Sequence, residues 1–103
     1  GMVAYSEERF GPAASILRVK DDAGEVPGAY DTSFGLGASV WSADKSRGEA
    51  VARQISAGAC FVNAIVRSDV RLPFGGTKAS GFGRELAEHG IHEFMNIKTI
   101  YVD

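Results

Sequence analysis

The chain has 103 residues, 45% of them hydrophobic and 23% charged, with a formal net charge of −2 at pH 7. This length and composition are typical of one globular domain with a modest core, and they exclude a disordered chain and a disulfide-stabilised scaffold. No block of like charge marks a surface for nucleic acid or for a membrane. Glycine is in excess: 13 glycines beside three prolines indicate tight turns.

The start of the chain and its cysteine content bear on its origin and location. Gly1 before Met2 resembles the scar of a cleaved expression tag, so we interpret residues 1–6 as a tag remnant and leader and residues 7–103 as the domain. The single cysteine cannot form an internal disulfide, and no segment has the apolar length of a signal peptide or a membrane span. We therefore expect a cytoplasmic protein.

The first third of the chain predicts one strand and little helix. Residues 13–19 (AASILRV) are apolar and rich in branched side chains, which favours a strand. Residues 20–33 are polar and interrupted by Gly24, Pro27 and Gly28, so at most one or two helical turns are expected there.

The middle of the chain predicts a parallel crossover unit. Residues 35–41 (GLGASVW) and 59–63 (ACFVN) read as buried strands. Between them, Ser42 is expected to cap a helix that stops at Gly58. The inward face of that helix is expected to contain Gly48, Val51, Ala52 and Ile55. A strand, a helix and a strand in this order form a parallel βαβ unit.

A second cluster of glycines follows, in residues 73–85, and predicts a long, sharply folded loop. A helix is expected to begin near Arg84, to be interrupted by Gly90 and to resume as far as Phe94. The last run, residues 97–102 (IKTIYV), predicts a strand that needs an edge to pair with, in its own sheet or in another subunit.

Three isolated candidates for chemistry have simpler interpretations. Cys60 lies in an apolar strand, where a thiol is more often a small buried hydrophobe than a nucleophile. His89 and His92 lack an Asp or Cys that would complete a ligand set, so no metal is predicted. The dinucleotide and P-loop fingerprints are incomplete around Gly76 and Gly81.

Three motifs taken together are more specific. They are ERFGP at residues 8–12, FGLG at residues 34–37, and LPFGG-x-K-x-SG-x-GRE at residues 72–85. In this order they resemble the C-terminal part of the NAD(P)-dependent aldehyde dehydrogenases. Ser68-Asp69 and the ending of residues 90–99 look most like bacterial succinate-semialdehyde dehydrogenases. The resemblance implies an α/β fold with a mainly parallel sheet and crossover helices, ending in an oligomerisation strand at residues 97–102.

The resemblance also implies roles for individual residues. Glu8 would contact the nicotinamide ribose and Phe10 the nicotinamide ring, although in an isolated fragment Glu8 could merely solvate a turn and Phe10 fill a core. Ser68 would bind the distal carboxylate of a semialdehyde, or be an ordinary turn serine. A structural loop would comprise Pro73, Phe74, Gly75, Gly76, Lys78, Ser80, Gly81, Gly83, Arg84 and Glu85. Within it, we expect Lys78 and Arg84 to donate hydrogen bonds to carbonyls.

In that family the nucleophilic cysteine, the general base and the coenzyme domain lie upstream of the ERFGP motif. We therefore expect a truncated enzyme whose parent oxidises a semialdehyde to the acid with NAD or NADP, and which alone has no catalytic residue and binds no coenzyme. A self-associating or partner-binding module, or one half of a split enzyme, is the alternative. The expected partners are a second copy, a full-length relative or an upstream half, and not nucleic acid or a membrane.

Overall fold

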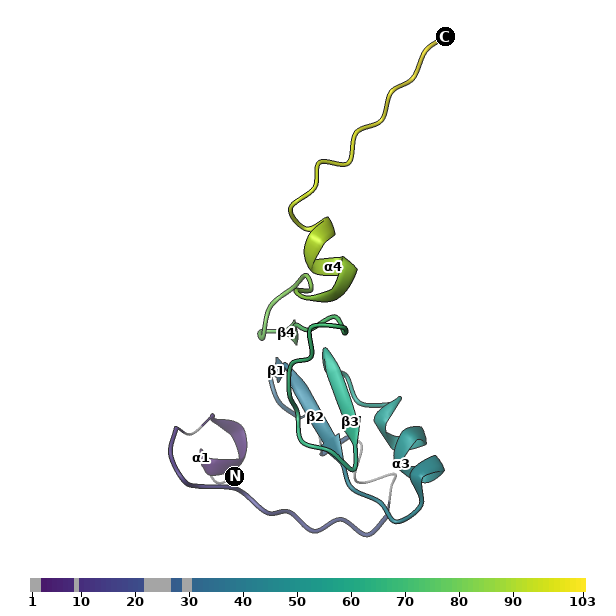
Figure 1. The fold of residues 1–103 in the computed structure, drawn as a ribbon. Coiled ribbons are helices and arrows are strands. Elements are labelled where there is room, and N and C mark those ends of the chain that lie inside the picture. The colour runs from purple at the N-terminus through teal and green to yellow at the C-terminus, as the bar shows by residue number, and fades with distance from the viewer. Residues whose placement is uncertain (1–2, 9, 22–26, 29–30) are drawn as a thin grey trace.

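The computed structural model describes residues 3–8, 10–21, 27–28 and 31–103. Figure 1 shows a small centre from which both ends of the chain extend. Its named elements are α1 (Val3–Ser6), β1 (Phe34–Gly35), β2 (Gly37–Val40), α3 (Lys45–Ala52), β3 (Ala59–Val62), β4 (Thr77–Lys78) and α4 (Ala87–His92). One or two helical turns are expected within residues 20–33, and half of that segment, residues 22–26 and 29–30, lies outside the described residues.

The centre of the fold is the predicted parallel unit. β2 and β3 pair in parallel, with Gly37 opposite Ala59 and Val40 opposite Val62. α3 connects them and packs against both strands. Gly48 is buried on the inner side of α3, where an added Cβ would lie 2.8 Å from Val62 Cγ1, so the absence of a side chain there allows the close approach of helix and strand.

The cap and the end of α3 differ from the prediction. Asp44, not Ser42, is the N-cap, and its Oδ1 accepts hydrogen bonds from the N–H groups of Ser46 (2.9 Å) and Arg47 (3.2 Å). The main chain of Ser42 is instead bonded to a side chain that follows β3. The helix ends at Ala52, well before Gly58, although Gly48 and Val51 are buried on its inner face as expected.

The strand predicted at residues 35–41 is divided at Leu36. β1 lies before the division and pairs antiparallel with β4, while β2 lies after it and pairs with β3. The described residues therefore form two two-stranded sheets, and the expected parallel arrangement holds for only one of them. β4 was not predicted, because a two-residue strand in a glycine-rich loop has no alternation to reveal it.

α4 is shorter than predicted. It begins at Ala87, after Leu86 (φ 65°) and Ala87 itself (φ 49°) adopt left-handed backbone conformations, and it ends at His92. Gly90 does not interrupt it, since the Gly90 N–H donates to the Leu86 carbonyl at 2.9 Å. The late start follows from Glu85, whose main chain is engaged with Phe74 in a β-bridge.

The two strands predicted near the ends are not formed. Residues 13–19 and 97–102 run as extended chain outside any strand (Figure 1), and Ile16 and Ile97 are each 92% exposed. A strand requires a neighbour that exchanges N–H and C=O hydrogen bonds with it. Both strand predictions are therefore wrong, because the described residues place no neighbouring edge beside either segment.

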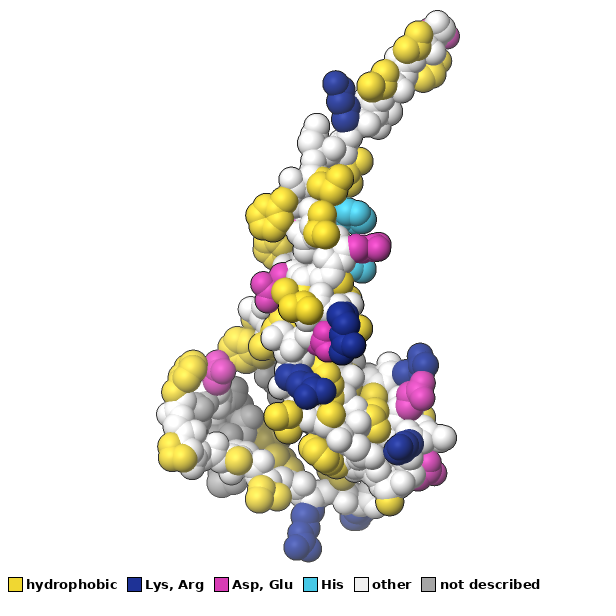
Figure 2. All heavy atoms as spheres, in the orientation of Figure 1, with side chains coloured by type: hydrophobic (Ala, Val, Ile, Leu, Met, Phe, Trp, Pro, Cys, Tyr) yellow, Lys and Arg dark blue, Asp and Glu magenta, His cyan; other side chains and the backbone are white. Residues whose placement is uncertain are grey.

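The expectation of a modest self-contained core was wrong. Among the described residues, Val51 is the one hydrophobic side chain that is buried. The accessible surface is 8581 Å², whereas a compact protein of 10.9 kDa exposes about 5,600 Å². The radius of gyration is 17.4 Å against about 13 Å for a compact chain of this length. Figure 2 shows the reason: hydrophobic side chains lie along the projecting ends.

The remaining element, α1, lies within the segment interpreted as a leader. The Tyr5 hydroxyl donates to Asp31 Oδ2 at 2.5 Å, which links this helical turn to the chain just before β1. No helix in the described part of the chain is long and apolar enough to cross a membrane.

Amide hydrogen exchange will test this division between centre and ends. We expect slow exchange at the N–H groups through which β2 and β3 pair, and exchange close to that of an unstructured peptide in residues 13–19 and 97–102. The measurement is made at low and at high protein concentration, to separate self-association from intrinsic order. Protection of residues 97–102 equal to that of β3 at low concentration would contradict the structure.

Candidate functional site

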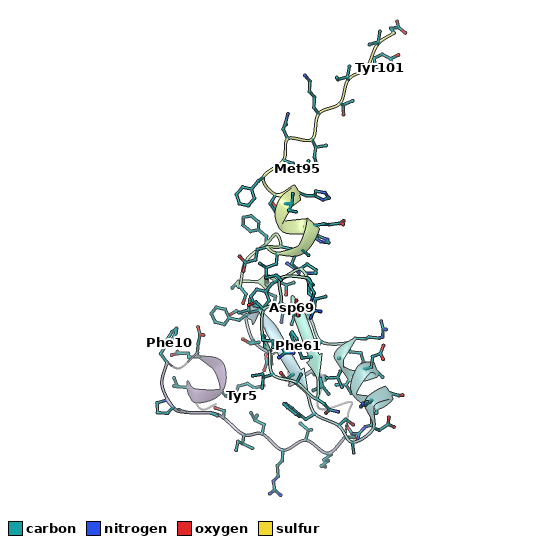
Figure 3. All side chains as sticks on the ribbon, viewed as in Figure 1. Tyr5, Phe10, Phe61, Asp69, Met95 and Tyr101 are labelled. Atoms are coloured by element: carbon teal, nitrogen blue, oxygen red, sulfur yellow. The ribbon has the colours of Figure 1, made fainter. Side chains whose placement is uncertain are left out.

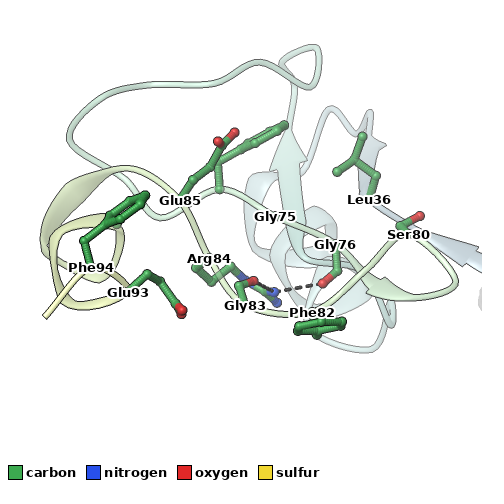
Figure 4. Close-up of a pocket in the computed structure, with 12 residues that line it drawn as sticks. Leu36, Gly75, Gly76, Ser80, Phe82, Gly83, Arg84, Glu85, Glu93 and Phe94 are labelled. Atoms are coloured by element: carbon green, nitrogen blue, oxygen red, sulfur yellow. Dashed lines mark hydrogen bonds between the residues drawn. The ribbon is translucent and has the colours of Figure 1, made fainter. Parts of the chain in front are cut away.

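The glycine-rich loop of residues 73–85 is closed by main-chain and side-chain hydrogen bonds. Phe74 and Glu85 exchange N–H···O bonds of 2.8 Å in both directions. Arg84 Nη1 donates to the Gly76 carbonyl (2.8 Å) and to the Gly83 carbonyl (2.6 Å), as seen in Figure 4 for Gly76. Lys78 Nζ donates to the Thr32 carbonyl at 3.2 Å. The expectation that Lys78 and Arg84 bond to carbonyls is confirmed.

The same loop is packed against β1 and against the turn before β3. The Gly35 N–H donates to Ser80 Oγ at 2.9 Å, and Thr77 Oγ1 donates to the Gly35 carbonyl at 3.3 Å. At Gly58 the two segments touch main chain to main chain, because an added Cβ would overlap the Gly75 carbonyl. Glycine is therefore required at position 58 for contact, not for backbone freedom.

This contact predicts a large difference between two glycine-to-alanine substitutions. Gly58→Ala forces the loop away from β3 and should lower the free energy of unfolding by about 3 kcal/mol, as overpacking against a rigid neighbour does. Gly28→Ala is the matched control, because an added Cβ there meets nothing within 4 Å. Urea unfolding followed by circular dichroism measures both. Equal midpoints for the two variants would contradict the close approach.

Asn63 is the first residue of the loop that follows β3, and its side chain binds this loop to Ser42. It adopts φ 55°, and its N–H donates to the Val40 carbonyl at 2.8 Å. Its side-chain Oδ1 accepts from the Ser42 N–H and its Nδ2 donates to the Ser42 carbonyl, both at 2.8 Å. The amide thus continues the β2–β3 ladder after the main chain has turned away, and it leaves no unpaired N–H at Ser42.

Asp69 and Arg71 fold the middle of this loop. Asp69 Oδ1 accepts from the Arg71 N–H (3.0 Å) and from Arg71 Nε (2.9 Å), and Asp69 Oδ2 accepts from Arg71 Nη2 (2.6 Å). These bonds hold the pKa of the Asp69 carboxyl far below its usual range and raise the pKa of the Arg71 guanidinium. Ser68 lies next to this pair and is exposed.

The depressed pKa sets the pH range in which the pair acts. The pKa of Asp69 is lower in the folded chain than the unfolded value of about 3.9. The pair therefore stabilises the folded loop above the unfolded pKa, and this stabilisation is lost as pH falls through the folded pKa. Asp69→Asn should therefore speed amide exchange at Arg71 and Leu72 at neutral pH. The difference from the parent chain should shrink only in strong acid. A difference already lost near pH 5, well above either pKa, would refute this role of the pair.

Asp69 also lines a cavity of about 420 Å³ beside β3. Its lining residues are Gly58, Ala59, Cys60, Phe61, Val62, Arg67, Asp69, Leu72, Pro73 and Phe74. Cys60 is half-buried here; partial burial raises the pKa of its thiol, and the Phe61 N–H opposes this only in part. A thiol that stays protonated at neutral pH is a poor nucleophile, which supports the interpretation of Cys60 as a packing residue.

Glu8 and Phe10 do not form a coenzyme site with the other described residues. Both are exposed, Phe10 to 94%, so the alternative that Phe10 fills a core is wrong. A nicotinamide ring needs contacts on more than one side, and an aromatic ring with so little contact supplies at most one wall. Figure 3 shows Phe10 beside α1 and Asp69, the neighbour of Ser68 in the chain, over the strands, so the coenzyme candidates lie apart from the loop that contains the substrate candidate.

The two histidines likewise remain separate from any site. His89 and His92 lie on the exposed surface of α4. In the part of the chain that the structure describes, no group of three His, Cys, Asp or Glu side chains is arranged to hold a metal ion.

Comparison with known proteins identifies the origin of the three motifs. The sequence profile of the aldehyde dehydrogenase family matches residues 1–100. The chain belongs to the aldehyde dehydrogenase family. Over 98% of its length it is 48% identical to a succinate-semialdehyde dehydrogenase of Mycobacterium ulcerans (strain Agy99) named for NADP(+). Over 99% it is 43% identical to one of Escherichia coli (strain K12) named for NAD(P)+. This aldehyde dehydrogenase chain spans 22% of each of these curated relatives.

The fold of this family member matches part of a solved enzyme. The crystal structure of succinic semialdehyde dehydrogenase from Streptococcus pyogenes, a complex with NADP+, is 40% identical with a TM-score of 0.88. The match covers 95% of this chain and 22% of that one, so most of the extended residues are included. The extended ends therefore follow a course found in part of a larger enzyme.

Two features of the loop after β3 were missed by sequence reasoning. The sequence pattern identifies Asn63 only as the end of a strand and does not distinguish Arg71 from other surface residues. The spacing Asp69-x-Arg71 is a signal for a local ion pair, because it allows one carboxylate to reach both the main chain and the side chain two residues on. The amide of Asn63 carried no comparable signal, since its partner lies 21 residues away.

Proposed function

We propose that this chain is the C-terminal part of an aldehyde dehydrogenase catalytic domain of the succinate-semialdehyde dehydrogenase type. Its parent reaction is the oxidation of a semialdehyde to the acid with NAD or NADP. The observation that carries the proposal is the identity of 48% and 43% to two enzymes of this name over nearly the whole chain. The order of the three motifs supports the C-terminal position.

The parent reaction requires chemical groups that this chain does not supply on its own. An aldehyde, an oxidised coenzyme and water give a carboxylic acid, a reduced coenzyme and a proton. The reaction needs a thiolate to attack the carbonyl, a base to activate water, and a coenzyme site to accept the hydride. The single cysteine is Cys60, half-buried with a raised pKa, and Phe10 stands exposed. We therefore propose that these 103 residues alone are inactive and bind no coenzyme.

Ser68 is the proposed substrate contact in the complete enzyme. Its hydroxyl is exposed next to the Asp69–Arg71 pair, where it can donate to the distal carboxylate of a semialdehyde. In an enzyme that carries this chain, Ser68→Ala should raise the KM for succinate semialdehyde about tenfold. The KM for an uncharged aldehyde is the control and should not change. In the complete enzyme, Glu8 and Phe10 would contact the coenzyme. We propose that this enzyme acts in the cytoplasm.

An assay of the purified chain tests the proposed inactivity. The chain is incubated with succinate semialdehyde and either NAD+ or NADP+, and the absorbance of the reduced coenzyme is followed. We expect no turnover, because the described residues supply neither an activated thiolate nor a closed coenzyme site. The E. coli relative is the positive control and Cys60→Ala the matched variant. Turnover that Cys60→Ala abolishes would refute the proposal.

The exposed apolar ends favour a second candidate function, a module that binds other copies of the same chain. Residues 97–102 include Ile97 and Ile100, exposed to 92% and 76%, on an extended segment that can add to a sheet edge. In the family such a strand joins an intersubunit sheet. Light scattering over a range of concentrations distinguishes the two candidates, because a chain that stays monomeric throughout cannot be a self-associating module.

A further inference from the structure

We infer that this chain docks on the complementary part of an aldehyde dehydrogenase when the two are separate polypeptides. The contacts would be its two extended segments, residues 13–19 and 97–102. This inference rests on the proposed function and names the partner that completes it. The partner is defined by chemistry: a catalytic domain of the same family that lacks the region matched by this chain and so exposes the sheet edges and apolar surface against which that region packs.

The area available for such a contact is large. The chain exposes 8581 Å², about 3,000 Å² more than a compact protein of its mass. A stable interface of standard size buries about 800 Å² on each partner. The excess is therefore several times what a specific complex requires.

The chemistry of the two segments suits addition to a sheet. Ile16 and Leu17 are exposed on the first segment, and Ile100 and Tyr101 on the second. Both segments run as extended chain outside the described strands, as Figure 1 shows. An extended apolar chain that adds to a sheet edge gains main-chain hydrogen bonds and buries alternate side chains at the same time.

The conformation of the chain favours the complement over a second copy. The match to the S. pyogenes enzyme covers 95% of this chain with a TM-score of 0.88, yet only 22% of that enzyme. The two segments thus follow the course they take within one much longer chain. They also lie at opposite ends of a molecule 62 Å long, so pairing of two copies tail to tail would leave residues 13–19 uncovered (Figure 1).

Co-expression tests the inference. The partner is the E. coli relative from which the 22% aligned with this chain has been deleted, carrying an affinity tag. We expect this chain to be retained as a 1:1 complex, measured by native mass spectrometry. Ile16→Lys and Ile100→Lys should each weaken the complex about tenfold or more, because each places a charge on an exposed apolar position that the complex would bury. Ala50→Lys, on the exposed side of α3, is the matched control and should bind like the parent chain.

The outcomes separate this inference from the proposed function. A 1:1 complex that is weakened by the two isoleucine variants and not by Ala50→Lys supports docking, whether or not the pair oxidises succinate semialdehyde. Absence of the chain from the tagged protein, retention that the isoleucine variants leave unchanged, or recovery of the chain only as a homo-oligomer would overturn it. In each of those cases an inactive isolated chain leaves the proposed function standing. Activity of the isolated chain would instead refute the proposed function.

Discussion

The parallel pairing of β2 with β3 is the interaction on which the rest of the structure depends. It brings residues some twenty positions apart into register, and α3 covers the pair because Gly48 has no side chain to hold the helix away. The loop after β3 starts at the end of this ladder, and the glycine-rich loop is packed against the turn that leads into it. Disruption of this pairing would release the loop after β3, whereas the glycine-rich loop would keep its own bonds to β1.

The fold was predictable where local pattern and tertiary environment agree. The βαβ unit was found because two apolar runs flank an amphipathic segment, and Gly48 and Val51 are buried as their spacing indicated. The cap was misplaced by two residues because Ser42 and Asp44 are equally good caps by type, and only the bond from Asn63 to Ser42 decides between them. That bond is not visible in a linear pattern.

The errors at the two ends have one physical cause. Residues 13–19 and 97–102 have the composition of strands, but a strand is a relation between two segments, and composition describes only one of them. The site was affected in the same way. Family resemblance located Ser68 and Phe10 in the sequence, whereas the structure leaves both side chains exposed. Sequence reasoning therefore supplied the βαβ unit, the membership of the family and the bonds of Lys78 and Arg84 to carbonyls.

The side chain of Asn63 has a consequence for how this region can change. Because the amide, not the main chain, makes the last contact to Ser42, the ladder is complete before the loop begins. Insertions, deletions and substitutions between residues 64 and 72 need not open the sheet. Such an arrangement separates the part that is free to diversify from the part that must be preserved. A chain that keeps this asparagine can alter the loop after β3 repeatedly at little cost to the scaffold beneath it.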